Sequence, residues 1–358
     1  MTPDFWRGKR VFLTGHTGFK GSWLSLWLSK LGADVSGYAL TPPTEPSLFD
    51  LAGIKARLAA HTVADVRDLE ALCQAMRTAK PDIAIHMAAQ PLVRYSYAAP
   101  IETYAVNVMG TAHFLEAARA ADTLGAVLCI TTDKCYENVG ITRGYVESDP
   151  LGGHDPYSSS KAGSELVISA YRRSFYAPRL GAPRVASARA GNVIGGGDWA
   201  VDRLIVDLMK AFLAGDKPLI RSPNAVRPWQ HVLEPLSGYL TLCEALWNHQ
   251  PGTDAAFNFG PAPEDAKPVS WIADRIALLW GGGVGWTLDT GADHLHEARY
   301  LHLDTAKAAA ELGYLPRWNL DKALSSVVDW YQSFAAGEDA AALTLGQIGQ
   351  FEASRQTA

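Results

Sequence analysis

Cysteine is scarce in this chain, and this scarcity argues against a disulfide scaffold and a cysteine-bound metal. Neither the Cys-x-x-Cys spacing of a zinc or redox site nor any pairing pattern occurs. Free thiols in a reducing compartment are the simplest interpretation of Cys73, Cys129, Cys135 and Cys243. We also expect no metal site, because we recognise no complete ligand set around the late histidines His294, His296 and His302.

Long basic runs and long apolar runs are missing as well. The formal net charge is −5, which disfavours nucleic acid as a partner. No apolar stretch approaches membrane-spanning length and no signal region opens the chain, so we expect a cytoplasmic protein that does not bind membranes. The 358 residues, 48% of them hydrophobic, are enough for a sizeable core in one large or two modest domains.

What the chain does contain is an alternation of short apolar strands and amphipathic helices. This alternation predicts an α/β fold of the Rossmann type, with a doubly wound parallel sheet. The expected helices cover residues 21–28, 69–77, 104–121 and 157–171. The expected strands cover residues 11–14, 34–40, 83–87, 126–130 and 185–190.

After Gly191 the texture of the sequence changes, because glycine and proline break the chain into short elements. We expect a smaller, discontinuous α/β substrate-binding lobe here, at 191–229, 261–299 and 316–358. The dinucleotide-binding domain then comprises 1–190, with segments near 230–260 and 300–315 returning to it. The stretch after about Gly337 is expected to be a loose helix or partly disordered.

A glycine triplet lies between the first expected strand and the first expected helix. Glycines at this point let the backbone approach a pyrophosphate, which the helix N-terminus attracts. The spacing Gly-x-x-Gly-x-x-Gly differs from the commoner Gly-x-Gly-x-x-Gly, but strand and helix flank the loop as required. We therefore predict a dinucleotide site at Gly15, Gly18 and Gly21, together with the intervening Thr17, Phe19 and Lys20.

The residues at the end of the second expected strand do not clearly distinguish NAD from NADP. No acidic residue stands there to bind a ribose diol, and no evident arginine replaces it. Lys20 and Arg67 are possible phosphate partners, so NAD is slightly preferred and NADP stays open. Asp65 and Val66 lie in a segment that could contact the adenine, although an ordinary solvated loop is an equal alternative at this point.

Tyr157 and Lys161 form a Tyr-x-x-x-Lys pair, one helical turn apart on the same face. An ammonium group held there favours tyrosinate. We therefore expect Lys161 to lower the pKa of Tyr157 and to make the phenol a usable general base. The glycine loop, the polar cluster at 131–134 and this pair, in that order, predict an enzyme.

With these residues in hand, the chain resembles the extended short-chain dehydrogenase/reductases and, within them, the branch of CDP-glucose 4,6-dehydratases. The resemblance spans residues 10 to about 318. Its segments are TGHTGFKGSW at 14–23, YALTPPT at 38–44, HMAAQPLVR at 86–94, TTDKCYEN at 131–138, DPYSSSK at 155–161, RAGNVIGGGDW at 189–199 and RPWQHV at 227–232.

This resemblance implies that CDP-glucose loses water to give CDP-4-keto-6-deoxyglucose in deoxysugar biosynthesis, with hydride lent to NAD and returned. Tyr157 would take the C4 hydroxyl proton, Thr132 would hydrogen-bond the C4 oxygen and Asp133 would protonate the leaving C6 hydroxyl. The related dTDP-glucose dehydratases carry a glutamate as C5 base where this chain has Lys134. Lys134 is therefore either the C5 base or a substrate anchor.

The resemblance also implies further contacts. Lys161 would bridge the nicotinamide ribose, and a homodimer or homotetramer would form through the helices around Tyr104 and Tyr157. Residues near the cofactor would be Thr14, Ala88, Ala89, Gln90, Thr103 and Asn107. Residues near the substrate would be Asn192, Gly197, Asp198, Trp199, Arg203, Arg221, Arg227, Trp229 and Arg299, the arginines suiting a diphosphate and a tryptophan suiting a ring.

Two other functions compete with this one. A sugar-nucleotide 4-epimerase or decarboxylating dehydrogenase could use the same fold, but it has no need of an acid–base pair after Thr132. A dinucleotide-sensing module without catalysis would usually have lost Tyr157 or Lys161, and this chain keeps both.

Overall fold

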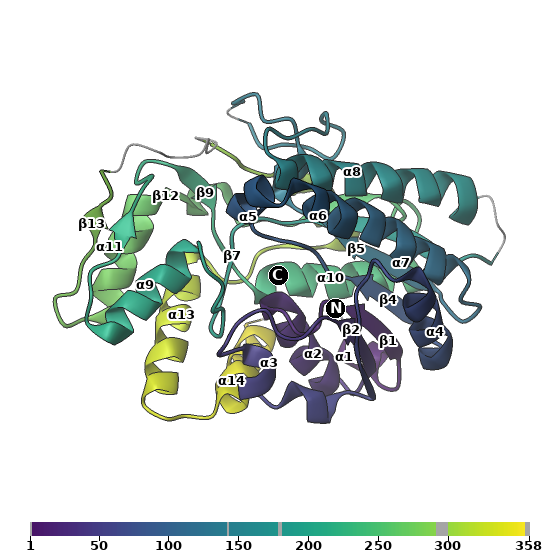
Figure 1. The fold of residues 1–358 in the computed structure, drawn as a ribbon, viewed down its shortest axis with the longest axis horizontal. Helices are drawn as coiled ribbons and strands as arrows, with labels where there is room; N and C mark the ends of the chain where they lie inside the picture. The colour runs from purple at the N-terminus through teal and green to yellow at the C-terminus, as the bar shows by residue number, and fades with distance from the viewer. Residues whose placement is uncertain (1, 142, 178–180, 291–299, 355–358) are drawn as a thin grey trace.

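A computed structural model describes residues 2–141, 143–177, 181–290 and 300–354 of the chain. Its centre is a seven-stranded sheet in which every pair of neighbouring strands is parallel (Figure 1). The predicted Rossmann-type fold is therefore confirmed. In spatial order the strands are β11 (Ala256–Asn258), β6 (Arg184–Arg189), β5 (Ala126–Ile130), β4 (Ile83–His86), β1 (Arg10–Thr14), β2 (Asp34–Ala39) and β3 (Ala60–Val63).

The central strands are buried on both faces, which explains their unbroken apolar runs. Successive side chains enter different cores: Val11 and Leu13 join the larger one, and Phe12 joins the smaller one on the other face. Helices α2 (Phe19–Lys30) and α10 (Leu233–Trp247) contribute to the larger core. Helices α4 (Leu69–Ala79), α7 (Gly110–Arg119) and α8 (Pro156–Tyr171) contribute to the smaller one.

The expected helix at 104–121 is present but is not uniform. It begins as α6 (Pro100–Tyr104), widens into a π-helical turn at Ala105–Met109 and continues as α7. Short helices complete this half of the molecule: α1 (Pro3–Trp6), α3 (Leu48–Leu51) and α5 (Val93–Ala98). A π-helical turn inside an α-helix often marks a functional position.

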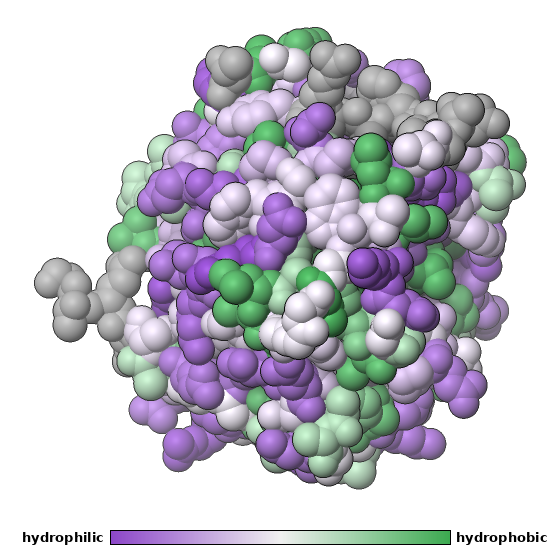
Figure 2. Space-filling model, turned by 90° about the vertical axis from the view of Figure 1, so that its left-hand side faces the viewer, coloured by the Kyte–Doolittle hydropathy of each residue, from purple (hydrophilic) through white to green (hydrophobic). Residues whose placement is uncertain are grey.

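The part of the chain after Gly191 combines short strands with several longer helices, and its division into a separate substrate-binding lobe stays a prediction. The described residues of this part form three two-stranded pairings: β7 (Val193–Ile194) with β10 (Gln230–His231), β9 (Val226–Pro228) with β12 (Ala266–Pro268), and β8 (Leu219–Ile220) with β13 (Thr287–Leu288). Its helices are α9 (Leu204–Ala214), α11 (Val269–Trp280) and α13 (Leu320–Ala335), while α12 (Ala306–Leu312) packs near β11. On this side of the molecule polar and apolar residues are interspersed (Figure 2).

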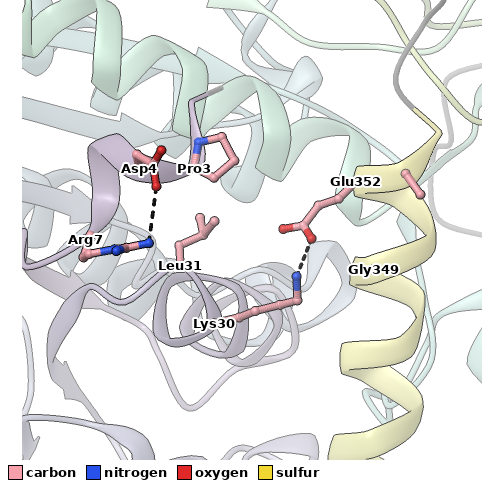
Figure 3. A pocket seen from close by; sticks show the side chains of 8 residues that line it. Pro3, Asp4, Arg7, Lys30, Leu31, Gly349 and Glu352 are labelled. Atoms are coloured by element: carbon pink, nitrogen blue, oxygen red, sulfur yellow. Dashed lines mark hydrogen bonds and ion pairs between the residues drawn. The ribbon is translucent and has the colours of Figure 1, made fainter.

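The C-terminal segment was expected to be a loose helix or partly disordered; a helix is present, but it is regular and well packed. Residues Ala340–Ala353 form the regular helix α14, which packs against α2 and α3 of the dinucleotide-binding half (Figure 1). Phe351 is buried edge-on against Trp27, and Lys30 pairs with Glu352 beside a cavity of about 450 Å³ (Figure 3). Buried aromatic contacts account for the order of this helix, which composition alone did not reveal.

Within the described residues, each helix is too short or too polar to serve as a membrane span.

Candidate active site

Most of the residues singled out in the sequence gather at the carboxyl edge of the parallel sheet. Strands β1, β4, β5 and β6 all end here, so residues that are far apart in sequence become neighbours. This edge is where open α/β sheets bind their ligands.

The glycine loop has the shape that a pyrophosphate needs. Gly15 has φ +76°, and a Cβ atom on it would lie 2.7 Å from the backbone nitrogen of Ala88. A Cβ atom on Gly21 would lie 2.1 Å from the carbonyl oxygen of Gly15. Gly18 is the N-cap of α2. Because glycine has no side chain that could accept hydrogen bonds from the first turn of the helix, the backbone N–H groups of that turn are available to a ligand. The loop therefore fits a dinucleotide.

Thr14 and Thr17 hold this loop in place. The hydroxyl of Thr14 accepts hydrogen bonds from the backbone nitrogens of Met87 at 3.1 Å and Ala88 at 3.2 Å, so it joins the ends of β1 and β4. The hydroxyl of Thr17 donates to the carbonyl of Leu40 at 2.9 Å. Both threonines thus stabilise the backbone of the glycine loop and the neighbouring strand ends.

Asn107 lies in the π-helical turn and joins three elements. Its Oδ1 accepts from the Gln90 backbone nitrogen at 2.9 Å, and its Nδ2 donates to Ser160 Oγ at 2.9 Å on α8. The Gln90 side chain donates to Thr103 Oγ1 at 2.9 Å. Gln90, Thr103 and Asn107, which are predicted to lie near the cofactor, are therefore joined by hydrogen bonds. Through Ser160, these bonds also connect the segment that follows Ala88 and Ala89 to helix α8.

The two proposed phosphate partners already have other partners. Lys20 Nζ donates to Tyr239 Oη at 2.9 Å, and burial, with the nearby charges of Lys161 and Arg203, lowers the pKa of Lys20 to about 7. Arg67 forms an ion pair with Asp65 at 2.5 Å. Val66, between them, is buried in the smaller core.

Tyr157 and Lys161 face the end of β5 from helix α8, as the spacing predicts. Lys161 Nζ donates to the carbonyl of Ile130 at 3.5 Å. The expected lowering of the tyrosine pKa is wrong for this structure: burial raises the pKa of Tyr157 to about 12, against the lowering effects of a hydrogen bond with Thr132 and of the Arg203 charge. Burial also lowers the pKa of Lys161 to about 8. The desolvation of both groups thus outweighs the effect inferred from spacing.

Thr132, Asp133 and Lys134 form a compact turn directly after β5. Asp133 is fully buried, and its Oδ1 accepts from Thr132 Oγ1 at 3.0 Å and from Lys134 Nζ at 3.2 Å. Its Oδ2 is buried without a hydrogen-bond partner in the described part of the protein. A hydrogen bond links Thr132 to Tyr157, so the phenol, hydroxyl, carboxyl and ammonium groups form one connected chain.

Gly191, at the end of β6, closes one side of this turn. A Cβ atom at position 191 would lie 1.8 Å from Oδ2 and 2.1 Å from Cγ of Asp133. We expect Gly191→Ala to displace the carboxyl group and to lower kcat about 100-fold, since misplacing a reacting group by about 1 Å can cost this much. Steady-state kinetics with Gly346→Ala as control would test this, because a Cβ atom at Gly346 meets nothing within 4 Å. A Gly191→Ala enzyme with the parent kcat would contradict the assignment.

Some of the predicted substrate residues lie in the protein interior, and the others adopt a special backbone conformation or are already paired. Asn192 has φ +47° and a buried Oδ1 without a partner among the described residues, while Trp199 and Trp229 are buried in the larger core. Trp229 already donates its indole N–H to the carbonyl of Lys267 at 3.2 Å. The rest are Gly197, at φ +74°; Asp198, paired with Arg203 at 3.4 Å; Arg221, paired with Asp202 at 3.6 Å; and Arg227, buried and bonded to the carbonyl of Val226.

Arg299 lies outside the described residues, as do His294 and His296. Among the residues that are described, no group of three or more histidine, cysteine, aspartate and glutamate side chains could hold a metal ion.

Sequence reasoning missed a buried polar network behind the site. Glu165 accepts hydrogen bonds from Ser187 Oγ at 2.8 Å and from Arg189 at 2.9 Å, and Arg189 in turn donates to Tyr136 Oη at 2.7 Å. Its signal in the sequence was the position of Glu165, four residues after Lys161 on the same helical face.

The chain is similar to known sugar-nucleotide enzymes over nearly its whole length. A family model described as GDP-mannose 4,6 dehydratase matches residues 12–254. The CDP-glucose 4,6-dehydratase of Salmonella typhimurium is 51% identical over 342 residues, which are 95% of each chain. A probable dTDP-glucose 4,6-dehydratase of Sinorhizobium fredii is 27% identical, over 90% of this chain and 92% of that protein.

Solved structures agree with these sequence matches. The structure of a dTDP-glucose 4,6-dehydratase double mutant from Streptomyces venezuelae, with NAD bound, is 26% identical, has a TM-score of 0.76 and covers 90% of this chain and 97% of that one. Since the family model covers well over half of the chain and the Salmonella relative matches nearly all of it, the chain belongs to the GDP-mannose 4,6-dehydratase family, within the extended short-chain dehydrogenase/reductases.

Proposed function

We propose that this chain is a CDP-glucose 4,6-dehydratase, a hydro-lyase that converts CDP-glucose to CDP-4-keto-6-deoxyglucose with bound NAD. The observation that carries the proposal is the connected chain Tyr157–Thr132–Asp133–Lys134 at the carboxyl edge of the sheet. It unites an oxidation catalyst with a second acid–base pair, and only a dehydration needs both. The identity of 51% to the Salmonella enzyme supports CDP-glucose as substrate.

In this proposal each group of the chain has a separate task. Tyr157 accepts the C4 hydroxyl proton as phenolate, a form that burial disfavours and that the hydrogen bond with Thr132 and the charge of Arg203 favour. Thr132 hydrogen-bonds the C4 oxygen and stabilises the ketone that forms. The ketone acidifies the C5 proton. The C6 hydroxyl then leaves as water with a proton from Asp133, and the C5 proton goes to a base.

Lys134 is the base that the geometry favours. Its Nζ lies 3.2 Å from Asp133 Oδ1. Moving one proton along this contact, from the ammonium to the carboxylate, gives an amine and a carboxylic acid in place of an ion pair. Lys134 can then act as the base at C5 and Asp133 as the acid at C6, as the elimination requires. The alternative role of Lys134 as a substrate anchor would not require a neighbouring carboxyl group.

NAD, when bound, would accept hydride from C4 and return it to C6, and the C5 base would return its proton to C5, which completes the 6-deoxy product. Gly15, Gly18 and Gly21 would hold its pyrophosphate. NAD is preferred to NADP because the two cations considered for a 2′-phosphate, Lys20 and Arg67, are bonded to Tyr239 and Asp65. Lys161 would bridge the nicotinamide ribose from α8.

Incubation of the purified protein and NAD with CDP-, dTDP- and GDP-hexoses, one at a time, would test the proposal. We expect mass spectrometry to detect the loss of one water from CDP-glucose and from no other substrate. Dehydration of another nucleotide sugar would correct the substrate. If none loses water, the dehydratase assignment fails, and an isomerised product would then indicate a 4-epimerase.

We also propose that the chain forms a dimer or tetramer through α6, α7 and α8. Apolar side chains on these helices and the adjoining turns stay exposed in the single chain; Ile101, Met109, Leu166 and Phe175 are 81%, 50%, 61% and 45% exposed. An apolar surface of this kind is typical of an interface.

Light scattering should therefore give at least twice the mass of 38.6 kDa. Leu166→Arg should shift the protein toward the monomer, because it places a charge in the proposed interface. Leu278→Arg, at a similarly exposed leucine on α11 in the other lobe, is the matched control and should leave the mass unchanged. A parent protein that is monomeric at working concentration would refute the proposal.

A further inference from the structure

We infer that the buried pair Glu165–Arg189 positions the catalytic Lys161 and keeps it charged, so that both belong to the active site although neither can touch a substrate. The inference deepens the proposed function and rests on it for the role of Lys161. The inference rests on geometry, because Glu165 and Lys161 form hydrogen bonds with consecutive residues at the end of β5.

The first part of the evidence is this pair of contacts. Lys161 Nζ donates to the carbonyl of Ile130, and one helical turn further Glu165 accepts a hydrogen bond from Thr131 Oγ1. Thr131 directly precedes Thr132 and Asp133. The two contacts therefore fix α8, which carries Tyr157, in register with the turn that carries the second acid–base pair.

Arg189 extends the same anchor to two further elements. It pairs with Glu165 at 2.9 Å, where both side chains are 4% exposed, and it donates to Tyr136 Oη at 2.7 Å. Tyr136 follows the catalytic turn and donates to Asn258 Oδ1 at 2.7 Å at the end of β11. Strands β5, β6 and β11, helix α8 and the catalytic turn thus meet in one buried network. Arg189 Nε is buried without a hydrogen-bond partner among the described residues, so the network restrains these elements through its other bonds.

The second part of the evidence concerns charge. Among the described residues, the titratable groups that act on Lys161 are Cys129, Cys135, His86, Lys20 and Glu165. The first three are neutral at pH 7, because burial raises the pKa of Cys129 and of Cys135 and lowers the pKa of His86. The remaining two are Lys20, which repels Lys161, and Glu165, which attracts it.

Glu165 keeps its charge at this pH. Burial alone would raise its pKa, but the charge of Arg189 and hydrogen bonds from Arg189, Thr131 and Ser187 hold the pKa below its ordinary value. Glu165 is therefore the carboxylate that keeps Lys161 protonated in an environment that lowers the lysine pKa to about 8.

The test is Glu165→Gln, which keeps the shape and removes the charge. Lys161 then loses its attracting partner, so its pKa falls. The alkaline limbs of NAD affinity, followed by tryptophan fluorescence, and of kcat should move to lower pH by about one unit. The control is Asp82→Asn, because Asp82 holds Arg10 through three hydrogen bonds at the opposite edge of the sheet. It should lower the melting temperature and leave both limbs in place.

If Glu165→Gln does not fold because Arg189 is left buried and unpaired, the double variant Glu165→Gln with Arg189→Met removes both charges and should show the same shift. Limbs that coincide with those of the parent, in either folded variant, would overturn the inference and leave the pair a purely structural role. A parent that binds NAD but dehydrates no sugar nucleotide would sink the proposed function instead, and the NAD titration would still decide the inference.

Discussion

Tyr157→Phe should abolish measurable turnover while leaving the fold and sugar-nucleotide binding intact. The variant loses only the phenol oxygen, which is the group proposed to accept the C4 hydroxyl proton, and loss of a general base costs roughly 10²–10⁴-fold in rate. Every later step needs the ketone, so no partial reaction should survive. Mass spectrometry of CDP-glucose incubations and the nicotinamide absorbance would both stay unchanged with time.

The matched control is Tyr176→Phe. Tyr176 is also buried, and its hydroxyl donates to the carbonyl of Leu115 at 2.7 Å, which is not part of the catalytic turn. This variant should lose some stability and keep the parent kcat. If Tyr157→Phe turned over at the parent rate, the phenol would not be the base, and the site would need another proton acceptor.

Asp133→Asn should separate the two halves of the reaction. The amide keeps the size of the carboxyl group and its contact with Thr132, but it has no proton to give to the departing C6 hydroxyl. We expect oxidation at C4 to persist and dehydration to fall by roughly 10²–10⁴-fold. A single-turnover experiment should then record a nicotinamide absorbance that rises and does not decay, together with a substrate that keeps its water.

A second substitution in the same turn checks that this effect belongs to the carboxyl group. Lys134→Met removes the partner of Asp133 and should also block dehydration after C4 oxidation if Lys134 is the C5 base. If Lys134 only anchors the substrate, Lys134→Met should raise KM and leave the ratio of oxidation to dehydration unchanged. Full dehydration by Asp133→Asn would rule out the acid assignment.

The sequence predicts the sheet and most of its helices because both depend on local patterns. The apolar runs at 83–87 and 126–130 have no polar alternation, and buried parallel strands require this. Tyr157 and Lys161 could be placed together because four residues make one helical turn. The adjacency of Thr132 to Tyr157 followed from the resemblance and the sheet edge together.

What the sequence does not reveal are effects that depend on several distant segments at once. The pKa of Tyr157 was predicted in the wrong direction, because spacing identifies Lys161 but not the burial that outweighs it. The close approach of Gly191 to Asp133 joins residues 58 positions apart, and no local pattern marks it. The order of α14 was missed for the same reason, since Phe351 becomes buried against Trp27, more than 300 residues earlier in the chain, and against Trp318.

The packing of α14 on α2 also has a consequence for how the protein is made. Synthesis proceeds from the N-terminus, so the nascent chain carries Trp27 and helix α2 long before Phe351 and α14 exist to pack against them. Strand β11, which completes the sheet beside β6, is likewise made late. The N-terminal part of the sheet and α2 therefore cannot reach their final packing on the ribosome as an independent unit, and their apolar surface needs protection until α14 has been made.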